Sequence, residues 1–193
     1  MKKIFASALI IALCFSASTL NAQNSIFTKG TSNLNAGLFV PTYFPKGMLP
    51  AFSVSYDYCV ADFGQKVGSL GVGGYAGLAI SKVHYGSYGS AIRGRETFFC
   101  IGPRAGYHFS GIPNVPKLDL YGVLFMGLRL YNLFENIRGE NNEDLGLGLR
   151  IFPFFAADAK VGAKYWFTKS FCFYLEAGWG HISMLEGGVS FKF

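Results

Sequence analysis

Charged residues are scarce in this sequence. Asp, Glu, Lys and Arg make up 15% of its 193 residues, whereas soluble domains usually hold about 25%. No segment is rich in Lys or Arg, so we expect no nucleic-acid partner. Disorder is also excluded, because disordered chains combine low hydrophobicity with high charge, and 51% of these residues are hydrophobic.

Cysteine is rare, and its spacing matches no metal or disulfide motif. Beyond Cys14, the chain holds only Cys59, Cys100 and Cys172, an odd number with no C-x-x-C pair. This arrangement predicts neither a disulfide framework nor a zinc site. We expect the three cysteines to be small, half-buried side chains, and we expect no metal and no cofactor.

A long apolar run is found only at the N-terminus. Lys2 and Lys3 precede an apolar stretch over residues 4–15, and small and polar residues lead to Ala22. This order is typical of a secretory signal peptide, so we assign residues 1–22 to a signal peptide and residues 23–193 to one domain. Farther along, the best candidate for a membrane helix runs only from Leu120 to Leu128, far short of the roughly 20 residues that a spanning helix needs.

Glycine and aromatic residues are abundant, and apolar residues recur with a period of two. The chain holds 25 Gly, 20 Phe, 11 Tyr and 2 Trp. Phe52, Val54, Tyr56 and Tyr58 alternate with polar residues, a pattern typical of a strand with two different faces. The same alternation indicates eight strands, at residues 32–40, 52–58, 70–80, 99–109, 118–130, 155–167, 171–179 and 185–193.

The two faces of these strands differ in charge. In the seven clearest segments, none of the 40 positions on the apolar face is charged. Lipid explains this exclusion, because one Lys or Arg at the bilayer midplane costs a barrel about 2–4 kcal/mol. Ten charged residues lie at the interleaved positions, namely Asp57, Arg104, Asp119, Arg129, Asp158, Lys160, Lys164, Glu176, Glu186 and Lys192.

These patterns predict an all-β fold, an eight-stranded antiparallel transmembrane up-and-down β-barrel. A barrel of about eight strands is filled by its own side chains, so the five acidic and five basic residues are expected to pair inside it as a polar plug. A narrow gated pore is the alternative for this interior. A secreted soluble barrel of lipocalin type would reverse the two faces, but the low charge and the aromatic strand ends favour the membrane barrel.

The connections are the expected place for binding, because a rigid barrel presents variable loops. With both termini in the periplasm, the exterior loops are predicted at residues 41–50, 82–94, 132–144 and 180–184. Leu145 to Ile151 continue the alternation of the sixth strand, which is expected to project above the membrane. Pro103 predicts a bulge in the fourth strand. The candidate residues for adhesion or ligand binding are basic or aromatic in one loop and acidic in another, namely Lys82, Tyr85, Tyr88, Arg93, Glu135 and Glu140.

The last three strands carry a family resemblance. Tyr165-Trp166-Phe167-Thr168, then the segments from Phe173 to Gly180 and from Gly187 to Phe193, resemble the small bacterial outer-membrane β-barrel domain family, which includes the OmpX-like and opacity-type barrels. The resemblance implies this fold and an outer-membrane location in a Gram-negative cell. Phe191 and the terminal Phe193 resemble the signal read by the barrel-insertion machinery, which is therefore an implied partner. Outer-membrane lipid and lipopolysaccharide are the other expected partners, and we expect a monomer.

One cluster could support chemistry. His181 and Ser183, with Glu186 nearby, resemble in part the outer-membrane lipid A deacylases, which use a His-x-Ser pair and a more distant Glu. A serine nucleophile needs an adjacent base held by a third group, and here the acid follows the serine by only three residues. We expect a non-enzymatic structural or surface-interaction barrel, with a lipid A-modifying hydrolase as the alternative.

Overall fold

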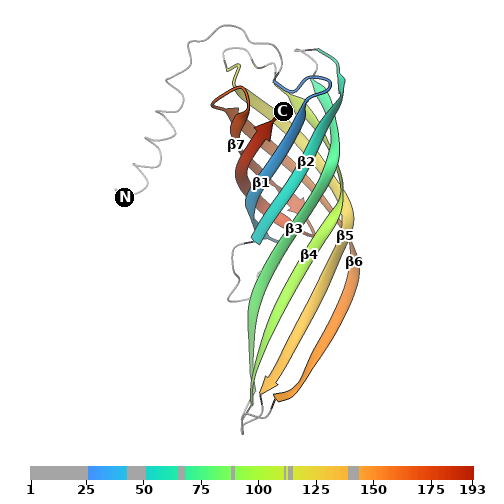
Figure 1. Ribbon diagram of the computed structural model, residues 1–193, viewed down its shortest axis with the longest axis vertical. Helices are drawn as coiled ribbons and strands as arrows, with labels where there is room; N and C mark the ends of the chain where they lie inside the picture. The colour runs from blue at the N-terminus through green and yellow to red at the C-terminus, as the bar shows by residue number, and fades with distance from the viewer. Residues whose placement is uncertain are drawn as a thin grey trace, which may run out of the picture.

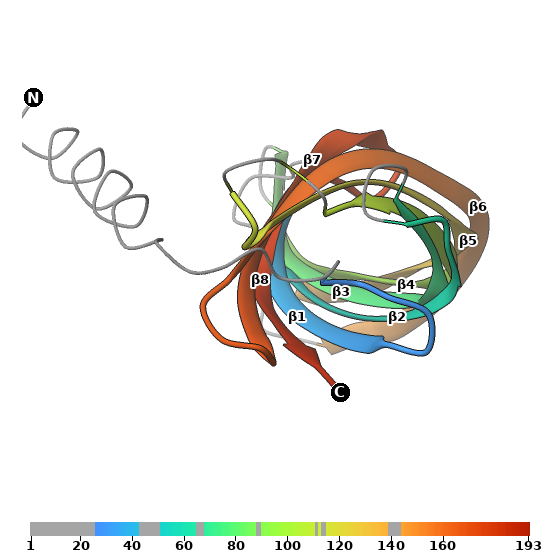
Figure 2. The same cartoon turned by 90° about the horizontal axis from the view of Figure 1, so that it is seen from above.

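Eight antiparallel strands form a closed barrel (Figures 1 and 2). The computed structural model describes residues 26–42, 51–64, 68–87, 90–110, 112, 115–138 and 144–193, and it describes side chains except at 81–96 and 131–152. The predicted signal peptide lies outside the described residues. The strands are β1 (Ser32–Pro41), β2 (Ala51–Asp62), β3 (Ser69–Ser87), β4 (Ser90–Phe109), β5 (Leu118–Arg138), β6 (Asp144–Trp166), β7 (Phe171–Gly180) and β8 (Ser183–Lys192).

The barrel is an up-and-down meander, as predicted. Each strand pairs with its sequence neighbour, and β1 pairs with β8 to close the ring. At the seam, the amides of Ser32 and Phe193 each donate to the other's carbonyl oxygen, both at 3.0 Å. Closure leaves no free backbone edge in the barrel wall, which a bilayer requires because lipid cannot hydrogen-bond to backbone groups. We call the end that holds both the N-terminal segment and the C-terminus the terminal end.

The alternating residues point to opposite faces of the wall. Outward-facing Leu124 and Val161 are 62% and 69% exposed, whereas Asp119 and Lys164, on the same two strands, are fully buried inside. The charged faces thus line the interior and the apolar faces form the outer surface. This is the membrane arrangement, and it rules out the soluble lipocalin type, whose apolar face points inward. None of the described residues forms a helix long and apolar enough to cross a membrane.

Four strands continue past the rest of the barrel. Pairing of β2 with β3 ends at Phe52 and Leu78, and pairing of β6 with β7 ends at Asp158 and Gly180. Strands β3 to β6 run on beyond these levels as a four-stranded sheet (Figure 1), which we call the extension. β6 begins at Asp144, so residues 145–151 belong to the sixth strand, as their alternation predicts. The predicted loops at 82–94 and 132–144 are wrong, because most of their residues belong to the strands of the extension.

The predicted bulge at Pro103 is also wrong. Ile101 pairs with Leu128, and Arg104 pairs with Phe125, so no residue is inserted between them. Pro103 lacks an amide hydrogen, which interrupts the ladder only locally. The two strands come together tightly here, since a Cβ added to Gly102 would clash with the backbone of Met126. The loss of pairing at the proline is therefore absorbed without a change of register.

The segment before β1 folds into the terminal end of the barrel. Phe27 is fully buried, and its ring lies 4.3 Å from the His108 ring, centroid to centroid. The amide of Gly30 donates to the carbonyl of Cys59 at 3.0 Å. Lys192 donates to the carbonyl of Ile26 at 3.2 Å. Residues 26–31 therefore form a plug at this end of the barrel, which we call the N-terminal plug.

Candidate functional site

A network of buried charges fills the middle of the barrel. Six charged side chains from β2, β4, β6, β7 and β8 are linked to one another by a series of ion pairs. Each of these residues is at most 7% exposed. They comprise three acids and three bases, namely Asp57, Glu176, Glu186, Arg104, Lys160 and Lys164. We call this set the charge network. Its members come from strands far apart in the sequence because the closed wall turns their inner faces toward one axis.

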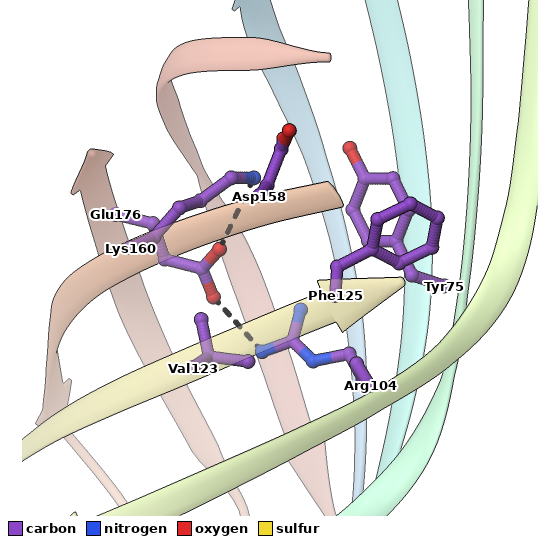
Figure 3. A pocket seen from close by; sticks show the side chains of 7 residues that line it. All are labelled: Tyr75, Arg104, Val123, Phe125, Asp158, Lys160 and Glu176. Atoms are coloured by element: carbon purple, nitrogen blue, oxygen red, sulfur yellow. Dashed lines mark hydrogen bonds and ion pairs between the residues drawn. The ribbon is translucent and has the colours of Figure 1, made fainter. Parts of the chain in front are cut away.

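Arg104 joins two carboxylates across the barrel. Its Nε lies 2.9 Å from Asp57 Oδ1, and its second terminal nitrogen lies 3.0 Å from Glu176 Oε1. Figure 3 shows Glu176 between Arg104 and Lys160. The Tyr121 hydroxyl also donates to Glu176 Oε1 at 2.9 Å. A planar guanidinium suits this bridging position, because its several donors lie in a fixed fork.

Glu186 is the most heavily bonded acid of the charge network. Lys160 Nζ donates to its Oε2 at 2.7 Å. Three hydroxyls from the interior faces of β2, β3 and β7 also donate to this carboxylate, those of Ser53, Tyr75 and Tyr174. A buried carboxylate is tolerated only when its lone pairs are satisfied in this way.

Asp57 and Lys164 are linked through an amide. Asn35 donates to Asp57 Oδ2 at 2.8 Å, and its own carbonyl oxygen accepts from Lys164 Nζ at 2.9 Å. Lys164 Nζ also lies 3.8 Å from Asp57 Oδ2. Asn35 thus bridges Asp57 and Lys164 through two hydrogen bonds, and these bonds are shorter than the distance between the two charged groups.

The interior is filled on both sides of the charge network. A cavity lined by Tyr75, Arg104, Val123, Phe125, Asp158, Lys160 and Glu176 measures about 10 Å³, which is room for about one water molecule. Toward the extension, buried apolar side chains form a layer that includes Phe39, Phe98, Phe125 and Ile182. Toward the terminal end lie the N-terminal plug and His108, which is 2.8 Å from Asp119.

Four of the ten predicted interior charges lie outside the charge network. Asp119 pairs with His108, as described above. Asp158 accepts the amides of Ile182 and Ser183 at 3.0 and 3.2 Å, so it holds the β7–β8 connection. Arg129 donates to the carbonyl of His181 at 2.9 Å, and its guanidinium lies over the Phe98 ring. Lys192 is half-buried, with its ammonium over the Trp166 ring.

The neutral members of the interior were not predicted from the sequence. Tyr75, Tyr121, Tyr174, Ser53 and Asn35 supply the hydrogen bonds that satisfy the buried charges. Strand parity could have found them, because each lies at an interleaved, inward-facing position of its predicted strand. Phe27 gave no such signal, because it precedes the first strand.

The residues proposed for hydrolysis do not form a catalytic group. Glu186 points into the charge network and is 1% exposed. His181 is exposed, and its Nδ1 lies 3.1 Å from the carbonyl oxygen of Ala157. Ser183 is fully buried, and its side-chain oxygen has no hydrogen-bond partner among the described residues. The base and the acid are therefore held by other groups.

The candidate binding residues fall in or beside the extension. Lys82 and Tyr85 are in β3, Arg93 is in β4, and Glu135 is in β5. Tyr88 and Glu140 lie outside the described residues. The β3–β4 register pairs Lys82 with Arg95 and His84 with Arg93. Four basic residues therefore occupy neighbouring positions on one face of the extension.

The fold resembles solved outer-membrane barrels. The chain is similar to Ail, the attachment invasion locus protein of Yersinia pestis, which was solved in complex with the heparin analogue sucrose octasulfate. The TM-score is 0.50 and the sequence identity is 12%, and the match covers 86% of this chain and all of Ail. Neisserial surface protein A matches with a TM-score of 0.47 and 16% identity, covering 89% of this chain and all of its own. No protein-family model and no curated protein matches the sequence. With its apolar outer face, closed meander and charged core, the chain has the fold of the small eight-stranded outer-membrane β-barrels.

Proposed function

We propose that this protein is a non-enzymatic surface-interaction barrel whose extension binds a partner outside the cell. The observation that carries the proposal is the continuation of β3 to β6 beyond the barrel. A structure that only had to span the bilayer would need about 9–11 residues per strand, whereas β6 runs over 23 residues. With the termini in the periplasm, the extension stands on the exterior side.

The filled interior supports a scaffold and argues against conduction. The apolar layer, the charge network and the N-terminal plug succeed one another along the axis. An ion would have to displace ion pairs and apolar side chains to pass, and desolvated ion pairs are costly to break. The narrow gated pore is therefore the weaker alternative. No geometry favours the lipid A-modifying hydrolase, because His181 and Glu186 are engaged elsewhere.

The first ligand class to test is a polyanionic glycan. The paired basic positions Lys82–Arg95 and His84–Arg93 offer charge complementarity to sulfate groups, and such complementarity steers association. The similar fold of Ail was solved with a heparin analogue, which makes heparin a suitable probe.

The test compares cells that display the native barrel with cells that display Lys82→Ser/Arg93→Ser/Arg95→Ser. We expect heparin binding to the variant to fall by about tenfold, since three exposed ion pairs are lost and each contributes about 0.5 kcal/mol. Lys117→Ser/Lys169→Ser, at the terminal end, is the matched control and should bind like the native barrel. Heat-modifiable mobility on a gel checks that each barrel is folded. Unchanged binding by the triple variant would overturn the polyanion assignment.

We also propose that the C-terminal strand is read by the barrel-insertion machinery. Phe191 and Phe193 are 49% and 73% exposed on the outer face of β8 and at its end, where a partner could contact them before closure. Phe193→Ala should reduce the amount of folded barrel in the membrane while leaving secreted precursor in the periplasm. Assembly at the native level would refute this role.

A further inference from the structure

The outer wall carries a groove that the charge network and the extension do not account for. One row of paired residues crosses five strands, from Val72 through Ala105, Leu124 and Ala159 to Trp179. All five line a single cavity of about 690 Å³. Because paired residues share a face of the sheet, the cavity opens on the outer, lipid-facing side of the wall.

The groove exists because small side chains lie between large ones. Ala105, Ala157 and Ala159 line its floor, whereas Leu124, Met126 and Trp179 stand up beside them at 59–80% exposure. An empty hollow is unfavourable, because the side chains that line it lose dispersion contacts. In a bilayer, a flexible hydrocarbon chain can enter such a hollow, and its volume lies within the range of about 300–1,000 Å³ usual for ligand sites.

One end of the groove is polar. Thr42 and His181 line it there, and the Thr42 hydroxyl donates to the carbonyl of Gly180 at 2.9 Å. The Arg129 guanidinium extends from the inner face of β5 over the Phe98 ring and reaches this end of the groove by donating to the His181 carbonyl. These residues belong to the side of the barrel from which the extension projects, where the β7–β8 connection lies. An acyl chain in the groove would therefore place its headgroup near a cationic rim.

We propose that the groove binds one acyl chain of a lipid A molecule, with the phosphorylated headgroup at the rim beside Arg129 and His181. The groove is continuous with the lipid-facing surface, which limits its occupant to membrane components. Its polar end faces the outer leaflet, whose lipid is the phosphorylated glycolipid. The cationic rim complements the charge of that headgroup. The proposal rests on the outer-membrane location and is independent of glycan binding by the extension.

Native mass spectrometry of the barrel, extracted from membranes that contain both lipid A and phosphatidylethanolamine, tests the site. The native barrel should keep one lipid A. Ala105→Leu/Ala159→Leu fills the groove and should lower lipid A occupancy at least about fivefold, since a pocket filled by side chains cannot also hold a chain. Ala163→Leu/Ala177→Leu, outward on β6 and β7 but outside the groove lining, is the matched control and should retain it.

A second arm tests the headgroup. Arg129→Gln/His181→Ala leaves the apolar groove intact and should shift occupancy from lipid A toward phosphatidylethanolamine. Three results would overturn the proposal: equal lipid A retention in the groove-filled variant, preferential retention of phosphatidylethanolamine by the native barrel, or a dimer that the groove-filling substitutions dissociate. Heat-modifiable mobility confirms folding of every variant, so a loss of lipid A is not confused with a loss of the barrel.

Discussion

The two faces of the barrel wall differ in chemistry although they alternate along the same strands. The inner face holds charged side chains that are almost fully buried, among them Arg104 and Glu176. The outer face of the same segments carries no charge at all. Both faces are removed from bulk water, so burial alone cannot explain why one accepts charge and the other does not.

The availability of ion-pair and hydrogen-bond partners explains why the inner face accepts charge and the outer face does not. Each member of the charge network meets an opposite charge from another strand, as Glu186 of β8 meets Lys160 of β6. A charge on the outer face would meet hydrocarbon, which has nothing to donate or accept. The cost of a substitution should therefore depend on whether it leaves a group without a partner.

Removing one member of the charge network should have the largest effect. Arg104→Met leaves Glu176 and Asp57 without their shared cation, and breaking a buried pair in this way costs about 3–5 kcal/mol. We expect the free energy of unfolding, measured by denaturant titration in vesicles, to fall by that amount.

A second substitution sharpens this prediction. Arg104→Met/Glu176→Gln leaves Asp57 with Lys164 and Glu186 with Lys160, so the remaining charges balance. The double variant should be more stable than Arg104→Met alone. If it is less stable, so that the two losses simply add, charge balance does not govern the interior.

A charge on the outer face should have the next largest effect. Leu124 is 62% exposed in the lipid-facing part of β5, and Leu124→Arg should lower the free energy of unfolding by about 2–4 kcal/mol. Phe173→Arg, near the terminal end of β7, is the control and should cost about 0–1 kcal/mol because the interface is wetter there. Equal losses at the two positions would contradict a lipid-facing assignment for Leu124.

Strand parity made the fold and the inner residues predictable. A side chain at Asp57 or Lys164 faces inward because the strand repeat is two, and one sequence suffices to read that repeat. The sequence pattern predicted the structure less well in the extension. Lys82 and Arg93 were assigned to a loop, because both faces of a sheet outside the membrane can meet water and the contrast between them disappears.

Through-space partners were not predictable. Arg104 of β4 meets Glu176 of β7 only because the wall closes and its strands are staggered by a particular amount. Strand parity predicts that both side chains face inward, but it does not predict the position of each side chain along the barrel axis. The burial of Phe27 depends in the same way on the space left at the terminal end, which no local pattern records.

An apolar group inside the polar interior should have an intermediate effect. Phe27 is fully buried against His108, and Phe27→Ala should lower the free energy of unfolding by about 1.5–3 kcal/mol, the value of burying such a side chain. Ile26→Ala, beside it in the N-terminal plug, is the control and should change stability by about 0.5 kcal/mol or less. A loss at Phe27 no larger than at Ile26 would show that the plug does not stabilise the barrel.

Removal of one neutral donor should have the smallest effect. Tyr174→Phe deletes a hydroxyl that donates to Glu186 at 3.1 Å, yet Glu186 keeps Lys160, Ser53 and Tyr75 as partners. The free energy of unfolding should fall by about 1 kcal/mol, the net value of one hydrogen bond. Tyr58→Phe, on the outer face at 40% exposure, is the control and should change stability less. A loss at Tyr174 as large as that of Arg104→Met would mean that hydroxyls, and not opposite charges, hold the buried carboxylates.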